Sequence, residues 1–183
     1  MLKGDKVLLR PVTEDDLETM WPWDSDVELV TLADDEPPIP RSPESFREQL
    51  KKIMSKPEEV ALFAIEADGA LIGTCSLFHF HPTAHNAELG VFIGDRAYWG
   101  QGYGREAVHL LLEYAFRYRN QHKVYLGTFD DNQRAIRSYK ASGFVEEGRL
   151  REHIWVDGRY KDLIYMGIMR SEWTGRAAAA TET

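Results

Sequence analysis

Three things are scarce in this sequence: cysteine, long apolar runs and basic charge. Cys75 is the single cysteine among 183 residues, so no disulfide can form within the chain, and this usage is typical of a reducing cytosol. No apolar run approaches the length of a membrane span, and the start from Met1 to Asp5 lacks the character of a signal peptide. We therefore expect a cytoplasmic protein that does not interact with membranes.

Acidic residues outnumber basic ones, 30 against 22, and the formal net charge is −8. This balance disfavours a nucleic-acid-binding protein, which normally carries a basic stripe. Twelve of the acidic residues lie between residues 14 and 48, where Arg41 and Arg47 are the only basic ones. This acidic segment, residues 14–48, fits a solvated surface and a surface that attracts cations equally well.

Hydrophobic periodicity and turn residues divide the chain into strands and helices. The expected strands are 6–12, 60–67, 71–80, 87–94, 123–129, 144–156 and 159–170. The expected helices are a short one after Thr13, then 43–56, 105–119 and 132–142. Their alternation, with hairpins at Asp68-Gly69 and Asp157-Gly158, predicts a single α/β domain with a mixed sheet flanked by helices. Cys75 lies inside a predicted strand, so we expect a buried core residue.

Glycine recurs at every second position of the stretch YWGQGYGREA, residues 98–107, directly before a predicted helix. Glycine is a poor helix former, but it lets the backbone approach a ligand and aim consecutive amides at one point. A helix N-terminus also favours phosphate binding, so this strand–loop–helix unit predicts a phosphate cradle. The alternative is a tight turn alone. The stretch matches neither a P-loop nor a dinucleotide fingerprint.

WGQGYGREA resembles the acetyl-CoA-binding signature of the GNAT N-acetyltransferases, in the form found in the RimJ/RimL and SpeG-like branches. The family pattern is Gln/Arg-x-x-Gly-x-Gly/Ala; Gly102 and Gly104 fill its last two positions, whereas Trp99 stands where Gln or Arg is usual. A second signature, NQRAIRSYKASGF at residues 132–144, matches Asn-x-x-Ala-x-x-x-Tyr-x-x-x-Gly-Phe. The resemblance implies a GNAT-type fold over residues 1–173, with a mostly antiparallel central sheet, and a disordered tail at 174–183.

This resemblance also implies a co-substrate, acetyl-CoA, and a place for it. The pyrophosphate would lie over the backbone amides of Gln101, Gly102, Tyr103, Gly104 and Arg105. The pantetheine arm would pair with the backbone of Val91, Phe92 and Ile93, as an added strand does. Asn132 would contact the arm, and Tyr139 would donate a proton to the departing thiolate.

Asn132, Ala135 and Tyr139 share one face of the predicted helix at 132–142, because they are spaced i, i+3 and i+7. A thiol with a pKa of about 8.5 is a fair leaving group when an acid is near, which suits Tyr139. The alternative for Tyr139 is an aromatic side chain that packs on the sheet. The serine often found at the position of Ala135 in RimL-type relatives is absent, so no mechanism through that hydroxyl is expected.

The acceptor amine must lose a proton, because an amine with a pKa near 10 is mostly protonated at neutral pH. A carboxylate can remove this proton directly or through water. Glu88, at the start of the strand that leads into the glycine stretch, is the candidate base. The alternatives are a merely salt-bridged glutamate at Glu88, or a base elsewhere in the acidic segment. Trp21 and Trp23 lie in this segment and suit either a cationic acceptor or the core.

His79, His81 and His85 are close in sequence, but no carboxylate or cysteine completes a metal-ligand spacing, so no metal is expected. We expect them to line the acceptor cleft or to lie at a strand end. The combined reading is an acetyl-CoA-dependent N-acetyltransferase that acts on a cationic amine: a polyamine, an aminoglycoside-like compound or a basic protein N-terminus. The alternatives are a non-catalytic acyl-CoA-binding module and a transferase with another acyl donor. The last hairpin offers an edge for a homodimer.

Overall fold

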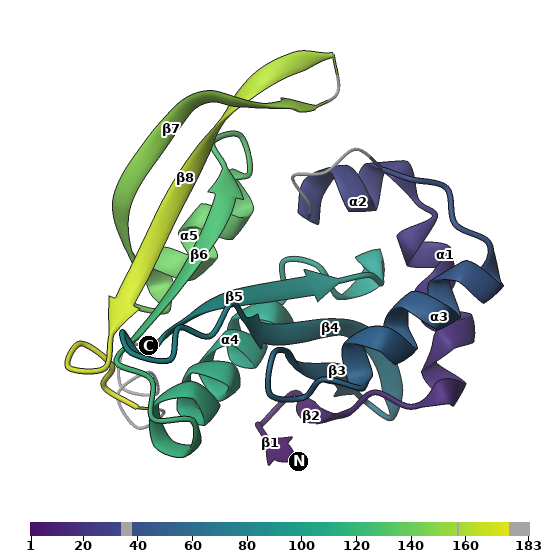
Figure 1. Ribbon diagram of the computed structural model, residues 1–183, viewed down its shortest axis with the longest axis horizontal. Coiled ribbons are helices and arrows are strands. Elements are labelled where there is room, and N and C mark those ends of the chain that lie inside the picture. The colour runs from purple at the N-terminus through teal and green to yellow at the C-terminus, as the bar shows by residue number, and fades with distance from the viewer. Residues whose placement is uncertain (34–37, 157, 176–183) are drawn as a thin grey trace.

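The eight strands of the described residues form one sheet in the order β1-β2-β3-β4-β5-β6-β8-β7 (Figure 1). The computed structural model describes residues 1–33, 38–156 and 158–175. The strands are β1 (Leu2–Lys3), β2 (Leu8–Pro11), β3 (Ala61–Ala67), β4 (Ala70–Phe78), β5 (Asn86–Ile93), β6 (Lys123–Phe129), β7 (Val145–Val156) and β8 (Arg159–Met169). Neighbouring strands are antiparallel except β5 and β6, which confirms the predicted mostly antiparallel sheet.

Helices connect these strands and agree with the sequence prediction except at α2 and η2, which were not predicted. They are η1 (Glu14–Asp16), α1 (Leu17–Asp24), α2 (Val27–Ala33), α3 (Pro43–Met54), η2 (Arg96–Tyr98), α4 (Tyr103–Glu113) and α5 (Gln133–Ala141). A π-helical turn, η3 (Tyr114–Tyr118), continues α4. Ser42 caps α3 by accepting a hydrogen bond from Ser45 N at 3.2 Å, as the Ser-Pro start predicts.

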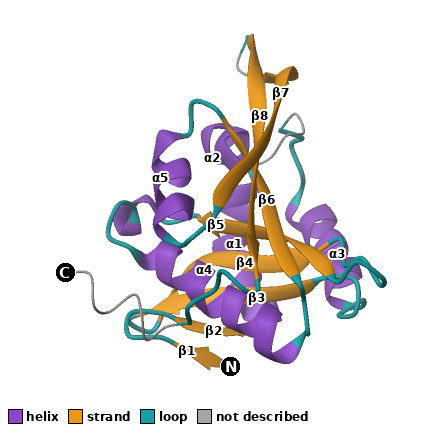
Figure 2. Ribbon diagram, turned by 90° about the vertical axis from the view of Figure 1, so that its left-hand side faces the viewer, coloured by secondary structure: helices purple, strands orange, loops and turns teal. Residues whose placement is uncertain are grey.

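Two apolar clusters hold helices on opposite faces of the sheet (Figure 2). On one face, α4 and α5 pack on the central strands, with Leu110, Leu111 and Leu112 almost fully buried. On the other face, α1 and α3 pack on β3 around Ala64. Burying apolar surface on both faces is the main favourable term in the folding of this domain. Cys75 is buried in the first cluster, and burial raises the pKa of its thiol, which confirms the predicted core role.

The sheet splits between β5 and β6 (Figure 1). These strands pair only where Asn86, Ala87 and Glu88 lie beside Lys123, Val124 and Tyr125. Beyond Glu88, β5 continues along β4 as far as Ile93, while β6 continues along β8 as far as Phe129. The two strands therefore diverge, and each leaves one edge without a neighbouring strand. We call the space between these edges the opening.

The hairpin β7–β8 extends beyond the end of β6 and arches away from the sheet (Figure 1). Its register shifts between Leu150 and Ile154, and Asp162 holds this bulge by accepting hydrogen bonds from Glu152 N and Arg149 Nη1. These contacts lower the pKa of Asp162. The predicted turn residue Asp157 and residues 176–183 of the predicted tail lie outside the described residues.

Candidate active site

The glycine loop, residues 99–104, connects β5 and η2 to the start of α4. Gly100 and Gly102 have φ values of +73° and +88°, a region that favours glycine. Gly102 is the N-cap residue of α4, and no side chain caps the helix there. The first N–H groups of α4, which have no partner within the helix, are therefore available to a ligand. This arrangement agrees with a phosphate cradle over Gln101 to Arg105.

The turn between β1 and β2 holds this loop in place. Lys6 Nζ donates a hydrogen bond to the carbonyl of Gln101 at 2.9 Å. The carboxylate of Glu106, in the first turn of α4, accepts hydrogen bonds from the backbone N–H groups of Asp5 and Lys6. A side chain at Gly100 would meet nothing within 4 Å, so the space above the loop is open. The residues present therefore fit a coenzyme A pyrophosphate.

Trp99, which replaces the usual Gln or Arg of the family pattern, has a definite role in this structure. Its indole Nε1 donates a hydrogen bond to the carbonyl of Ile93 at 2.8 Å. Its ring carries the guanidinium of Arg134 at 3.9 Å from the ring centroid and that of Arg96 at 5.7 Å. Trp99 thus ties the end of β5 to the first turn of α5 across the opening.

The backbone of β5 presents alternate residues to the opening. Gly94 N donates to the carbonyl of Ile72 on β4, and backbone groups of successive strand residues point to alternate sides. The groups of Phe92 therefore face β4, whereas those of Val91 and Ile93 face the opening. The carbonyl of Ile93 is bonded to Trp99. Val91 is thus the best placed of the three predicted residues to pair with a pantetheine arm, and Phe92 contributes its side chain elsewhere.

Tyr139 and Asn132 come from α5, on the other side of the opening. Tyr139 is 8% exposed, and burial raises the pKa of its phenol to about 12. A phenol with this pKa keeps its proton at neutral pH and can therefore donate it. The side-chain oxygen of Asn132 caps α5 by accepting a hydrogen bond from Ala135 N at 3.2 Å. The predicted contact of Asn132 with the arm would thus use its amide N–H₂ group.

Glu88 lies where β5 and β6 part. His79 Nδ1 is 2.9 Å from Glu88 Oε2, and Tyr125 on β6 also bonds to this carboxylate. Desolvation, followed by the charge of Glu88, raises the pKa of Tyr125, so its hydroxyl acts as a donor. The side chain of Glu88 remains 21% exposed, so a ligand can reach it. The predicted alternative of a salt-bridged glutamate thus depends on His79, the basic side chain in contact with Glu88.

Glu88 and Tyr139 lie on opposite faces of the sheet. Ala87 and Leu89 are buried in the same cluster as Tyr139. Because successive strand side chains point to opposite faces, Glu88 lies on the face that α1 and α3 cover. The opening, where β5 and β6 diverge, is the part of the sheet that lies between these two faces without strand pairing.

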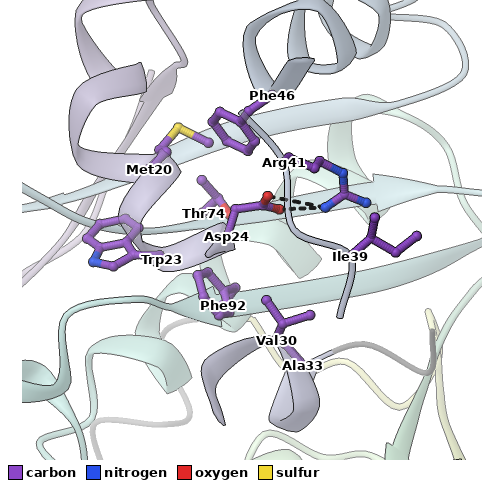
Figure 3. Close-up of a pocket in the computed structure, with 10 residues that line it drawn as sticks. All are labelled: Met20, Trp23, Asp24, Val30, Ala33, Ile39, Arg41, Phe46, Thr74 and Phe92. Carbon is purple, nitrogen blue, oxygen red and sulfur yellow. Dashed lines mark hydrogen bonds and ion pairs between the residues drawn. The ribbon is translucent and has the colours of Figure 1, made fainter. Parts of the chain in front are cut away.

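An apolar pocket lies on the same face as Glu88 and has a volume of about 260 Å³ (Figure 3). It is lined by Met20, Trp23, Asp24, Val30, Ala33, Ile39, Arg41, Phe46, Thr74 and Phe92. Trp23 meets the ring of Phe92 edge to face, and Arg41 Nη1 bonds to both carboxylate oxygens of Asp24 at 3.0 and 3.2 Å. The pocket thus combines aromatic walls with one ion pair. The indole N–H of Trp21 instead bonds to the carbonyl of Arg41.

Much of the acidic segment is neutralised within the chain. Its ion pairs are Glu14–Lys51, Asp16–Arg10, Asp24–Arg41, Asp26–Arg96 and Glu28–Arg96. Asp34, Asp35 and Glu36 lie outside the described residues. The segment's charge therefore supports the structure around α1 to α3 as well as any attraction of cations.

The three clustered histidines lie at a strand end, one of the two places predicted for them. His81 Nδ1 accepts the N–H of Ala84 at 3.0 Å, within the loop between β4 and β5, and His79 contacts Glu88. In the described parts of the chain, no group of three or more His, Cys, Asp or Glu side chains is placed to hold a metal ion.

Two residues of this site were not found from the sequence. Tyr125 meets Glu88 only through the register of β5 and β6, which no local pattern reveals. Arg134 meets Trp99 across the opening. A local signal for Arg134 did exist, because a cation in the first turn of a helix is unfavourable and suggests a purpose other than stability.

The fold described above and the comparisons with known proteins indicate the same family. Residues 6–145 match the family model described as Acetyltransferase (GNAT) domain. The chain belongs to the GNAT acetyltransferase family. It is an N-acetyltransferase that uses acetyl-CoA as its donor. None of the helices described in the structure is both long enough and apolar enough to span a membrane.

Several relatives are polyamine-modifying enzymes. The chain is 34% identical over 116 residues to spermidine N(1)-acetyltransferase of Vibrio cholerae, covering 63% of this chain and 66% of that protein. It is 28% identical over 176 residues to the Escherichia coli enzyme of the same name, covering 94% and 91%. The crystal structure of spermidine N-acetyltransferase from Vibrio cholerae with CoA and spermine matches with a TM-score of 0.85 at 28% identity, covering 92% and 98% of the chains.

Proposed function

We propose that this N-acetyltransferase acetylates a primary amine of a polycationic small molecule of the polyamine class. The opening of the sheet, with Glu88 on one face and Tyr139 on the other, is the observation that carries the proposed chemistry. The acceptor class is supported by relatives named for spermidine that align over most of the chain. The acidic segment supports it as well, since its carboxylates favour cations.

In this proposal Glu88 is the general base. The acceptor amine arrives as an ammonium group and gives one proton to the Glu88 carboxylate before or during its attack. Hydrogen bonds from Tyr125 and His79 orient the carboxylate toward the opening. His79 is 71% exposed, so it connects this group to solvent.

Tyr139 is the general acid on the other face. When bound, acetyl-CoA supplies an activated thioester whose carbon the amine attacks directly, with no covalent intermediate on the protein. The buried phenol of Tyr139 then gives its proton to the departing sulfur, the acetylated nitrogen releases its second proton, and the Tyr139 phenolate takes up a proton before the next turnover. The backbone N–H of Val91, which faces the opening, is positioned to stabilise negative charge on the acetyl oxygen.

The apolar pocket beside β5 suits the carbon chain of a polyamine. Trp23, Phe46 and Phe92 give aromatic faces that contact both methylene groups and ammonium groups favourably. Asp24 is its carboxylate, and a bound ammonium group would share this carboxylate with Arg41. We therefore expect the amine that is not acetylated to lie near Asp24.

The test is a panel of acceptors assayed with acetyl-CoA by release of free thiol. It contains spermidine, spermine, an aminoglycoside, and a peptide with the N-terminus of a basic ribosomal protein. We expect spermidine or spermine to give the highest kcat/KM, and we expect this value to fall with rising salt because exposed charges are screened. Tyr139→Phe serves as the control that release depends on the proposed acid.

Other results would overturn the proposal in distinct ways. A preference for the peptide would indicate a protein-modifying enzyme. A preference for the aminoglycoside would indicate an enzyme that modifies aminoglycosides. Turnover with succinyl-CoA but not acetyl-CoA would show a different donor. If CoA binds and no amine in the panel is acetylated, a binding module would be the better description.

A further inference from the structure

Arg134 is an unusual cation for its position in the structure. It is the second residue of α5 and therefore lies at the positive end of that helix dipole. Its guanidinium is stacked over Trp99, which begins the loop leading to the uncapped N-terminus of α4. Arg134, in the first turn of α5, thus lies beside the loop that leads to the N-terminus of α4.

No carboxylate of the described residues compensates this charge. Asp131, the nearest acidic residue in sequence on the α5 side, is engaged by Arg159 and Lys161. Desolvation by its surroundings lowers the pKa of Arg134, and no acidic side chain opposes this shift. An arrangement that concentrates positive charge without an anion is unfavourable in the free protein, so it points to an anionic ligand.

We propose that Arg134, held by Trp99, binds the pyrophosphate of coenzyme A. This rests on the proposed position of that group over the amides of Gln101 to Arg105. The family pattern begins with Gln or Arg, and this chain has Trp99 there. The structure assigns Trp99 the role of a platform on which a guanidinium from another helix is displayed. The positive charge that the motif lacks is therefore supplied by α5.

Stacking suits this role because the planar guanidinium keeps its edge free while its face lies on the indole. The edge can donate two parallel hydrogen bonds to phosphate oxygens. Arg134 also begins the helix that carries Tyr139, and Asn132 caps that helix. Binding at Arg134 would therefore fix the position of the proposed acid as well as the coenzyme.

The experiment measures the Kd of the full chain for CoA, without an acceptor, by titration calorimetry. Because hydrogen bonds to charged groups are strong, we expect Arg134→Ala to raise Kd about 10- to 100-fold. Arg134→Lys keeps the charge but loses the planar stack, so an intermediate loss is expected. Arg137→Ala is the matched control, since Arg137 is an exposed arginine of the same helix; its Kd should stay close to the wild-type value.

Dephospho-CoA, which keeps the pyrophosphate but lacks the 3′-phosphate, identifies the group bound. The ratio of Kd between Arg134→Ala and wild type should be the same for both ligands. A ratio that falls to one with dephospho-CoA would assign Arg134 to the 3′-phosphate and overturn the proposal. Equal Kd values for Arg134→Ala and wild type with CoA would also overturn it.

Thermal unfolding separates binding from a structural role. The ligand-free Arg134→Ala protein should melt at a temperature no lower than that of Arg137→Ala, because it loses an unfavourable charge at a helix N-terminus, whereas its stabilisation by CoA should be smaller. A lower melting temperature without ligand, combined with an unchanged Kd, would show that Arg134 only supports the fold. If wild type itself binds no CoA, the proposed cradle fails together with this inference.

Discussion

The two sides of the opening treat charge differently. On the donor side, formed by β5, the glycine loop, α4 and α5, the N-terminus of α4 has no side-chain cap and Arg134 has no anionic partner in the described residues. On the acceptor side, formed by α1 to α3, Asp24, Asp26 and Glu28 are paired with arginines. In the proposed function, the side that binds the polyanionic coenzyme keeps a positive charge without an internal counter-ion, whereas the side that binds the amine has carboxylates that already have partners.

The largest effect is expected at the acid on the donor side. Tyr139→Phe should lower kcat about 10²- to 10⁴-fold, because proton donation to the thiolate is lost. Steady-state rates of thiol release measure kcat, and calorimetry should show unchanged CoA binding. With a pKa of about 12, the Tyr139 phenol stays protonated throughout the assay range, so any basic limb of the wild-type pH profile belongs to another group. An active Tyr139→Phe enzyme would remove this assignment.

Glu88→Gln tests the base on the acceptor side. The amide cannot take a proton, so kcat should fall about 10²-fold at neutral pH, while the KM of the acceptor changes little. The residual rate should recover as pH rises and free amine accumulates. The measurement is a pH profile for both proteins, with His81→Ala as a control for disturbance of the loop between β4 and β5. Parallel profiles for Glu88→Gln and wild type would argue against Glu88.

Asp16 tests whether the acidic segment also stabilises the fold. Arg10 lowers the pKa of the Asp16 carboxyl, with help from Thr13, so ionised Asp16 stabilises the folded state. Asp16→Asn should cost about 1–3 kcal/mol in the free energy of unfolding at pH 7. This difference should persist down to a pH of about 4 and then shrink as the folded-state carboxyl takes up its proton. Urea unfolding measures it, and Asp15→Asn, an exposed neighbour, should behave as wild type.

The smallest effect is expected in the apolar pocket. Arg41→Ala should free Asp24 for the acceptor and lower the KM for spermidine about two- to fivefold, as expected for a partly exposed ion pair. Arg47→Ala, on α3, also removes one positive charge and should lower the KM for spermidine less. A higher KM in Arg41→Ala would mean that Arg41 itself positions the acceptor. This result would reverse the contrast drawn between the two sides.

Most elements of the donor side could be predicted from the sequence because they are local, whereas the contact between Arg134 and Trp99 was not found. The glycine loop, the start of α4 and the face of α5 each follow from spacing within about a dozen residues. The turn at Asp68-Gly69 and the cap at Ser42 are local as well, and both are present. Turns and helix ends that depend on a few adjacent residues can therefore be predicted from the sequence.

The acceptor side could not be predicted in this way, because it depends on contacts between distant segments. The Asp24–Arg41 pair, the Arg96 bridge to Asp26 and Glu28, and the meeting of Glu88 with Tyr125 all depend on packing and register. The twelve acidic residues were visible as a cluster, but their partners were not. Helix α2 was missed because its seven residues are too few to establish a periodic pattern.

The short pairing of β5 with β6 has a mechanical consequence. Three residue pairs alone join the main chains of these strands, fewer than between any other neighbouring strands except the terminal pair β1–β2, so the sheet resists separation weakly at this seam. A pantetheine arm along Val91 would lie between β5 and β6 like an inserted strand and would join their unpaired edges. Binding of the coenzyme would then also stabilise the contact between β5 and β6. Backbone amide hydrogens that border the seam should therefore exchange more slowly with solvent in the coenzyme-bound protein.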